Sequence, residues 1–190
     1  MHISGLRHQG LPVVIIDVEA SALEQGSYPI EIGWAPGHAA EFESFLIRPT
    51  EEWVEGGIWS DLSEEIHGIS KAELQTAGVS APEAIARLEA GLAGSIVLSD
   101  AIEWDGYWLR RLFETANRPC PVKLQPFNRV VKEVALANGI DPELVAQRIE
   151  DWALVTSEAG VHRAGPDAAD NYRQAIAIMS ANGIDRVDEK

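Results

Sequence analysis

The sequence lacks the features by which secreted and membrane proteins are recognised. Its 190 residues include one cysteine, Cys120, so no disulfide can form within the chain, as is typical of proteins in a reducing cytoplasm. The longest apolar run near the N-terminus, residues 11–16, is too short for a membrane span or for the core of a signal peptide. We therefore expect a cytoplasmic protein that does not enter a membrane.

Basic residues are also scarce, with 15 Lys and Arg against 30 Asp and Glu and a net charge of −15. Proteins that hold long duplexes neutralise many phosphates with Lys and Arg, so this balance favours short or single-stranded partners. Six of the basic residues gather between positions 110 and 132, where the local net charge is about +5. This basic segment is either a solvated helix face and loop or a track for a phosphate backbone. Its members are Arg110, Arg111, Arg118, Lys123, Arg129 and Lys132.

The hydrophobic pattern predicts an α/β fold in a single domain, with a core of about residues 12–182 and a short polar tail at 185–190. Strand-like runs at 12–19, 28–35 and 40–48 are separated by turn residues, as in an antiparallel meander. Residues 49–79 read as irregular, with two short helical pieces. Three antiparallel strands followed by alternating helices and strands predict a mixed central sheet with helices on both faces.

The second half of the chain alternates between helical and extended patterns. Ser80, with Glu83 three residues later, forms a capping box that opens a helix. A short strand is expected at 96–98 and another is possible at 121–125. The remaining helices are expected at 105–116, 128–138, 142–158 and 166–182, the last beginning beside Pro166.

Asp17 and Glu19 end the apolar strand 13–16 in the segment VVIIDVEAS. Alternate residues of a strand share a face, so the two carboxylates point the same way. Two such charges about 4 Å apart repel by roughly 4 kcal/mol at an effective dielectric near 20. Carboxylates that converge must be protonated or bind cations, and oxygen ligands favour Mg²⁺ or Mn²⁺. This is the chemistry of two-metal phosphodiester hydrolysis, although the same pair could instead cap a turn.

Asp105, in SDAIEWDGYWL, is the candidate for a third acidic ligand, in competition with Asp100 and Glu103. The alternative role for Asp105 is a simple helix N-cap. A third motif, HRAGPDAAD, contains His162 and, in the first turn of the expected last helix, Asp167. The helix dipole stabilises a carboxylate there. Histidine, with an ordinary pKa of about 6.5, can take a proton from water near neutral pH, although a lone histidine often has only a structural role.

These three motifs, in this order, resemble the DEDDh group of 3′→5′ exonucleases, which includes polymerase proofreading exonucleases, RNase T and oligoribonuclease. The resemblance covers roughly residues 12–180. It implies the ribonuclease-H-like fold and two bound Mg²⁺ ions, with Mn²⁺ able to substitute. It also implies hydrolysis at single-stranded or frayed 3′ ends of DNA or RNA, with release of nucleoside 5′-monophosphates. Several members of the group are homodimers, so a homodimer is possible.

The resemblance also implies a role for each motif residue. Asp17, Glu19 and Asp167 would hold one metal, Asp17 and Asp105 would hold the second, and His162 would deprotonate the attacking water. The segment after the first motif departs from the family, which has Thr/Ser-Thr/Ser-Gly-Leu where this chain has Ala20, Ser21, Ala22 and Leu23. In the family, backbone amides of this segment meet the 3′-hydroxyl and the leucine wedges against the last base.

The resemblance of residues 20–23 to this family segment also implies which residues contact substrate. Ala20, Ser21 and Leu23 are therefore predicted to contact substrate, and Trp104 is the candidate for stacking on a base. Ala22 would restrict the segment if its position needs a positive φ. His67, in EIHGIS, also resembles a family segment and is expected to be structural or close to substrate.

Two other functions compete with the exonuclease. The first is a nucleic-acid- or partner-binding module that has kept the fold but has little or no turnover because of the altered 20–22 segment. The second is a glycosidase with paired carboxylates. A glycosidase needs no metal and leaves His162 and a fourth acidic residue without a role.

Overall fold

The computed structural model describes residues 6–36, 42–156 and 161–179. The predicted tail at 185–190 lies outside these residues. Six strands form one sheet: β1 (Arg7–His8), β2 (Leu11–Ala20), β3 (Pro29–Pro36), β4 (Glu43–Leu46), β5 (Ile96–Ser99) and β6 (Leu124–Pro126). The order is β4-β3-β2-β5-β6, with β1 paired to β2 beside this path. Strands β2, β3 and β4 are antiparallel, whereas β5 and β6 run parallel to β2. The predicted mixed sheet is therefore confirmed.

Eight helices are assigned within the described residues: α1 (Glu51–Gly56), α2 (Asp61–His67), α3 (Lys71–Ala77), α4 (Ala81–Leu92), α5 (Ile102–Glu114), α6 (Phe127–Ala137), α7 (Pro142–Thr156) and α8 (Ala164–Met179). The first four each begin at a Ser or Thr whose hydroxyl accepts a bond from a backbone N–H three residues on. Helix α1 is not predicted by the sequence pattern, and α5 and α8 begin three and two residues before their predicted starts. None of the described helices is long and apolar enough to cross a membrane.

The two faces of the sheet are covered by different helices, as the alternation along β2 requires. Val14, Ile16 and Val18 belong to the core with α4 and α5, whereas Val13 and Ile15 belong to the core with α6, α7 and α8. Asp17 and Glu19 continue the row of Val13 and Ile15. They therefore lie on the face that α8 covers.

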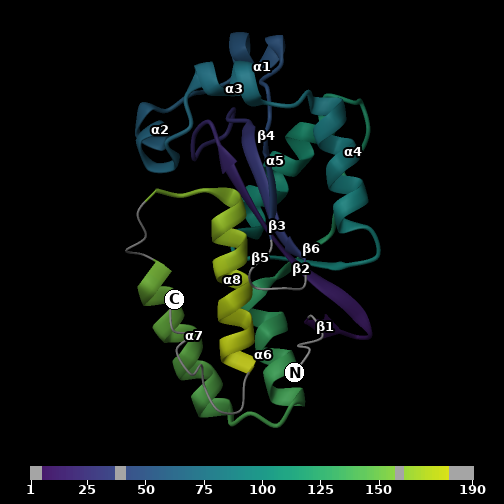
Figure 1. Ribbon diagram of the computed structural model, residues 1–190, viewed down its shortest axis with the longest axis vertical. Coiled ribbons are helices and arrows are strands. Elements are labelled where there is room, and N and C mark those ends of the chain that lie inside the picture. Colours follow the sequence, from purple (N-terminus) through teal and green to yellow (C-terminus); the bar gives the residue numbers. More distant parts are fainter. Residues whose placement is uncertain (1–5, 37–41, 157–160, 180–190) are drawn as a thin grey trace.

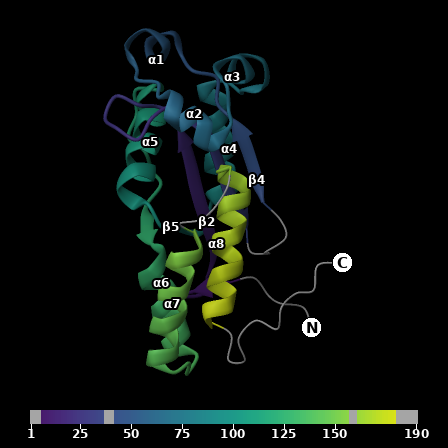
Figure 2. The same cartoon turned by 90° about the vertical axis from the view of Figure 1, so that its left-hand side faces the viewer.

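The helices α1, α2 and α3 lie together at one end of the molecule (Figures 1 and 2). This is the end toward which β2 runs and at which α8 begins. The backbone of His162, just before α8, is tied to α2 because its N–H donates to the carbonyl of Ile66 at 3.0 Å. The ends of β2 and α2 and the start of α8 thus meet in one place.

Candidate active site

The first group of carboxylates forms where β5 ends beside β2. The parallel register pairs Ile15 with Leu98, so Asp17 and Asp100, each two residues further on, are neighbours at the same edge of the sheet. Asp105 reaches this edge from the first turn of α5. Carboxylate oxygens of Asp17, Asp100 and Asp105 all lie within 4.8 Å of one another. We call these three residues the Asp17 cluster.

Burial and mutual repulsion raise the pKa values of two members of the Asp17 cluster, Asp17 and Asp105. Burial, followed by the charges of Asp105 and Glu19, raises the pKa of Asp17 well above its usual range. The pKa of Asp105 is raised to about 8, mainly by burial, and a hydrogen bond donated by the Ser99 hydroxyl at 2.5 Å opposes the rise. Asp100 is exposed and accepts a hydrogen bond from Asn171 Nδ2 at 3.1 Å. A divalent cation would relieve this repulsion.

Asp100 and Asp105 compete in the sequence for one acidic role, and the structure places both at the same edge. The simple N-cap role for Asp105 is wrong, because Ala101 is the N-cap of α5 and Asp105 lies inside the helix. A helix that begins at Ile102 brings the Asp105 side chain back toward the end of β5. Glu103 lies on the same first turn but is exposed and is not part of the cluster.

The second group, which we call the His162 cluster, consists of Glu19, His162 and Asp167. Their ligand atoms also lie within 4.8 Å of one another, and His162 Nδ1 is 3.2 Å from Asp167 Oδ2. The pKa of Glu19 is raised to about 7 by burial and by the charges of Asp167 and Glu31, with Arg163 opposing the rise. Burial raises the pKa of Asp167, and the neighbouring His162 opposes that rise.

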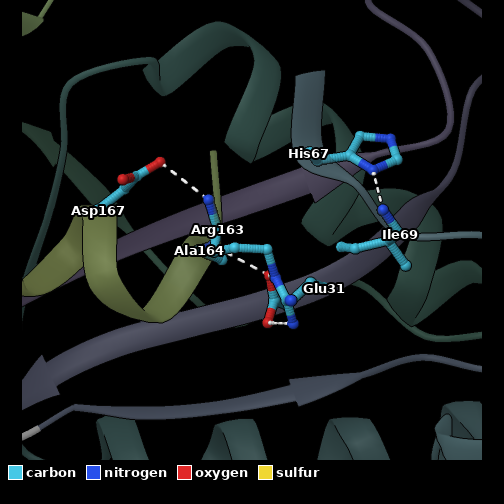
Figure 3. A network of polar contacts seen from close by, with 6 residues as sticks. All are labelled: Glu31, His67, Ile69, Arg163, Ala164 and Asp167. Atoms are coloured by element: carbon cyan, nitrogen blue, oxygen red, sulfur yellow. Dashed lines mark hydrogen bonds and ion pairs between the residues drawn. The ribbon is translucent and has the colours of Figure 1, made fainter. Parts of the chain in front are cut away.

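A polar network holds the start of α8 against β3 (Figure 3). The Glu31 carboxylate accepts hydrogen bonds from Arg163 Nε and Nη2, both at 2.9 Å, and from the Ala164 N–H at 3.0 Å. Asp167 Oδ2 accepts one from the Arg163 N–H at 3.2 Å. Sequence analysis gave Glu31 no role. The available signal was a glutamate inside the otherwise apolar strand PIEIGWA, where a buried charge needs a partner.

A hollow of about 160 Å³ opens beside the His162 cluster. It is lined by Glu19, Ala20, Ala22, Leu23, Ser63, Ile66, His67, Trp108 and His162. Ala20 and Leu23, two of the predicted substrate residues, thus border it. His67 is buried; its Nδ1 accepts a bond from the Ile69 N–H at 3.0 Å, while its Nε2 has no hydrogen-bond partner among the described residues. The expectation that His67 is structural or close to substrate agrees with this position.

The segment after Glu19 is less restricted than its sequence suggested. Ala22 is buried and does not have a positive φ; among the described non-glycine residues only Gln9 and Asn117 do. Replacement of glycine by Ala22 therefore imposes no backbone strain. Ser21, however, is fully buried. Its hydroxyl donates to the Ile58 carbonyl at 2.6 Å and accepts from the Tyr28 N–H at 3.0 Å, and its N–H donates to the Tyr28 carbonyl at 2.9 Å. These contacts give Ser21 a structural role and do not support its predicted contact with substrate.

Trp104, the candidate for stacking on a base, lies in the first turn of α5 and stacks on Trp108 with ring centroids 5.5 Å apart. Trp104 lines a second hollow together with Asp100 and Glu103 rather than the one bordered by Leu23. The structure therefore gives no support to stacking of Trp104 on a base held beside Leu23, because Trp108 already covers part of its ring.

The basic segment is partly neutralised by neighbouring acids. Arg111 pairs with Glu114 at 3.3 Å, Arg118 with Glu89 at 2.8 Å and Arg129 with Glu133 at 3.4 Å. Such exposed pairs are worth little in stability, but they reduce the positive charge available to phosphates. The contacts favour the solvated-face interpretation for these three arginines, whereas Arg110 is exposed on α5.

Comparison with known proteins gives a match in structure alone. No family model matches the chain, and no curated protein matches it. The crystal structure of E. coli exonuclease I in complex with a dA16 oligonucleotide matches with a TM-score of 0.54 and 14% identity, over 69% of this chain and 31% of that one. Its zinc-bound complex with single-stranded DNA matches with a TM-score of 0.53 and 14% identity, over 64% and 29%.

The chain shares the fold of the part of exonuclease I that it matches. This confirms the ribonuclease-H-like architecture expected from the resemblance to DEDDh exonucleases, of which exonuclease I is one. The chain spans about a third of the length of the exonuclease I structures it matches. At 14% identity the similarity shows the fold alone, and the activity has to be argued from the site.

The donor atoms of both clusters fit divalent cations. The Asp17 cluster offers carboxylate oxygens only, which suit Mg²⁺ and Mn²⁺, and the His162 cluster adds an imidazole nitrogen that suits Mn²⁺ or Zn²⁺ as well. Burial is the main cause of the raised pKa values of Asp17, Glu19 and Asp105, and the neighbouring carboxyls add to the rise. His162 can act in this arrangement either as a ligand or as a base.

Proposed function

We propose that this protein is a metal-dependent 3′→5′ exonuclease that releases nucleoside 5′-monophosphates from single-stranded or frayed nucleic-acid ends. The observation that carries the proposal is that two groups of possible metal ligands, the Asp17 cluster and the His162 cluster, form beside each other, since the charges of Glu19 and Asp167 act on Asp17. The carboxyls of the two clusters would repel one another strongly without a cation. The similarity of the fold to that of exonuclease I supports the proposal by analogy.

The carboxylates would divide between two cations. Asp17 and Asp105, with Asp100 beside them, would hold one Mg²⁺ or Mn²⁺ ion, and Glu19 and Asp167, together with Asp17, would hold the other. Bound cations supply charge neutralisation at the phosphate and a lower pKa for water. The protein's own contribution is to fix these carboxylates on β2, α5 and α8, where they need little reorganisation.

His162 would act as the general base. Its Nδ1 faces Asp167 Oδ2 at 3.2 Å, so a proton on Nδ1 can be held there while Nε2 is left with a lone pair. The Nε2 atom can then accept the proton of the attacking water. Asp167 would orient the imidazole.

The hollow beside the His162 cluster would receive the base of the terminal nucleotide. Exposed Leu23 and Ile66 stand on its rim, 67% and 46% accessible, and offer contacts to a base that is not stacked in a duplex. A base-paired end would have to fray to reach them. This explains why the proposed substrate is single-stranded or frayed.

Digestion of labelled oligonucleotides tests the proposal. DNA and RNA oligomers of several lengths, labelled at either the 3′ or the 5′ end, are incubated with Mg²⁺, Mn²⁺ or EDTA. We expect 5′-labelled strands to shorten stepwise, 3′-labelled strands to release labelled mononucleotide at once, and EDTA to stop both reactions. Full activity in EDTA would exclude the two-metal mechanism. Oligonucleotide binding with no cleavage in a single-turnover assay would instead support the non-catalytic module.

A further inference from the structure

The face of β3 that looks toward the site has a composition unlike that of the rest of the strand. Ile30, Ile32 and Trp34 belong to the core with α4 and α5. The alternate residues Glu31 and Gly33 are on the opposite face, and the antiparallel register places them directly across from Glu19 and Asp17. Cross-strand neighbours on one face have Cβ atoms about 4.5–5.5 Å apart. Glu31 and Gly33 are therefore next to two of the proposed metal ligands.

Gly33 allows the start of α8 to lie directly on the sheet. A Cβ built at Gly33 would be 2.3 Å from the carbonyl carbon of Ala164 and from the nitrogen of Gly165. Both are backbone atoms, which cannot move aside as the end of a side chain can. Any side chain at position 33 would push the first turn of α8, and with it Asp167, away from Asp17.

Glu31 holds the first turn of α8 in a fixed orientation through hydrogen bonds. The first N–H groups of a helix have no partner within the helix, and the residue before α8, Arg163, cannot cap them with its side chain. Glu31, which is 1% exposed, supplies the acceptor from β3 by binding the Ala164 N–H and two nitrogens of the Arg163 guanidinium (Figure 3). His162 and Asp167 flank these two residues in the chain, so the network sets their position relative to Glu19.

The same network keeps Arg163 away from the ligands. The Arg163 charge acts on Glu19 and lowers its pKa, so the guanidinium lies within electrostatic reach of the site. Two hydrogen bonds to Glu31 hold the guanidinium on β3 as a bidentate ion pair, away from the proposed metal ligands. Without Glu31 the guanidinium would be free to pair with Glu19 or Asp167 and to compete with a cation.

We propose that Glu31 and Gly33 are positioning residues, which hold the first turn of α8 so that His162 and Asp167 complete a site with Asp17 and Glu19. This inference rests on the proposed function for its effect on turnover, but its effect on metal binding stands independently. Neither residue would touch substrate or metal.

The test compares Glu31→Gln with Glu73→Gln. The Glu73 carboxylate also acts on Arg163 electrostatically but makes no hydrogen bond to α8 among the described contacts, so it controls for lost charge alone. Mn²⁺ affinity is measured by calorimetry without substrate, the single-turnover rate is measured at saturating oligonucleotide, and hydrogen exchange is followed at the first amides of α8. We expect Glu31→Gln to lose about 10–100-fold in Mn²⁺ affinity and in rate. KM should change less than about threefold, and exchange should be faster only at the start of α8.

Two results would overturn the inference. One is a folded Glu31→Gln protein with wild-type Mn²⁺ affinity and wild-type exchange at α8. The other is an equal loss in Glu73→Gln, which would make charge rather than position the cause. If Glu31→Gln does not fold, Arg163→Lys keeps the charge and loses the bidentate geometry, and unchanged Mn²⁺ affinity in that variant would count against the inference. Failure of the wild-type protein to cleave any oligonucleotide would overturn the proposed function, and the affinity and exchange measurements would still decide the role of Glu31.

Discussion

The Asp17 cluster and the His162 cluster lie at the end of the same strand but balance their charges differently. The Asp17 cluster contains only carboxyls, with neutral partners Ser99 and Asn171. The His162 cluster contains a histidine, and Arg163 lies within electrostatic reach of it. The Asp17 cluster therefore depends on a bound cation to balance its negative charge, whereas Arg163 already balances part of the negative charge of the His162 cluster. This difference suits the first to tight metal binding and the second to proton transfer.

The largest effect should come from the residue shared by the two proposed metal sites. Asp17→Asn should abolish turnover, a loss of at least about 10⁴-fold, because it removes a ligand from both cations. The stability of this variant in EDTA should rise, since a half-buried carboxyl that its neighbours repel is replaced by a neutral group. Both are measured directly, by single-turnover cleavage and by thermal unfolding. Retention of more than about a tenth of the wild-type rate would mean that the two clusters do not share Asp17.

The second prediction separates a base from a ligand in the His162 cluster. His162→Ala should reduce the single-turnover rate by about 10²–10⁴-fold, the usual contribution of a general base. Mn²⁺ affinity, measured by calorimetry, should stay within a few-fold of wild type. Wild-type activity at pH 7 would exclude the base role, and a loss of Mn²⁺ binding as large as the loss of rate would make His162 a ligand.

The third prediction ranks the two acids of the Asp17 cluster that compete in sequence. Asp105→Ala should cost about 100-fold or more in rate, whereas Asp100→Ala should cost at most about 10-fold. Asp105 is buried and already oriented by Ser99, whereas Asp100 is exposed and bonded to Asn171. Cleavage rates of the two variants at saturating Mg²⁺ decide the order. An inactive Asp100→Ala beside an active Asp105→Ala would reverse the assignment.

The fourth prediction concerns pH. The pKa values of Glu19 and Asp105 are raised to about 7 and about 8 in the folded protein. At a pH between the ordinary pKa of a carboxyl and these raised values, the folded protein therefore binds more protons than the unfolded chain. In EDTA, these groups should therefore make the free energy of unfolding fall as pH rises from about 5 to about 8, and Tm should drop by about 2–4 °C for each kcal/mol lost.

Mn²⁺ should have the opposite pH dependence. Its ligands must be deprotonated, so the gain in Tm on adding Mn²⁺ should grow from about pH 5 to about pH 8. The Asp105→Asn variant should lose part of both effects because it no longer titrates. A Tm in EDTA that rises across this range by the same amount in wild type and in Asp105→Asn would contradict the raised pKa values.

The smallest effect should come from residues outside both clusters. Replacing Arg110 and Arg111 together by Ala should weaken oligonucleotide binding a few-fold without changing the single-turnover rate at saturation, whereas Arg87→Ala on α4 should change neither. Few phosphates would be neutralised, so log K should fall with log salt with a slope of only about −2 to −3. A steep slope, or equal rates on blunt duplex and single strands, would contradict a single-stranded substrate.

The sequence predicted the elements that depend on local pattern. The alternation of side chains along β2 was enough to place Asp17 and Glu19 on one face, and the capping box at Ser80 gave the start of α4. The start of α5 was misplaced because Ala101, with no capping side chain, gives no local signal. Helix α1 was missed because one turn and a half carries too little periodicity to stand out from a loop.

By itself, the sequence determined which residues have the chemistry of a metal site and in what order they occur. The tertiary structure alone decided that Asp100 joins Asp17 and Asp105, that Ser21 is used by the fold, and that Glu31 binds Arg163 across 132 positions of the chain. The physical reason is one of range. Strand alternation and helix capping act between residues a few positions apart, whereas the pairing of β2 with β5 and the docking of α8 on Gly33 exist only once the sheet has assembled.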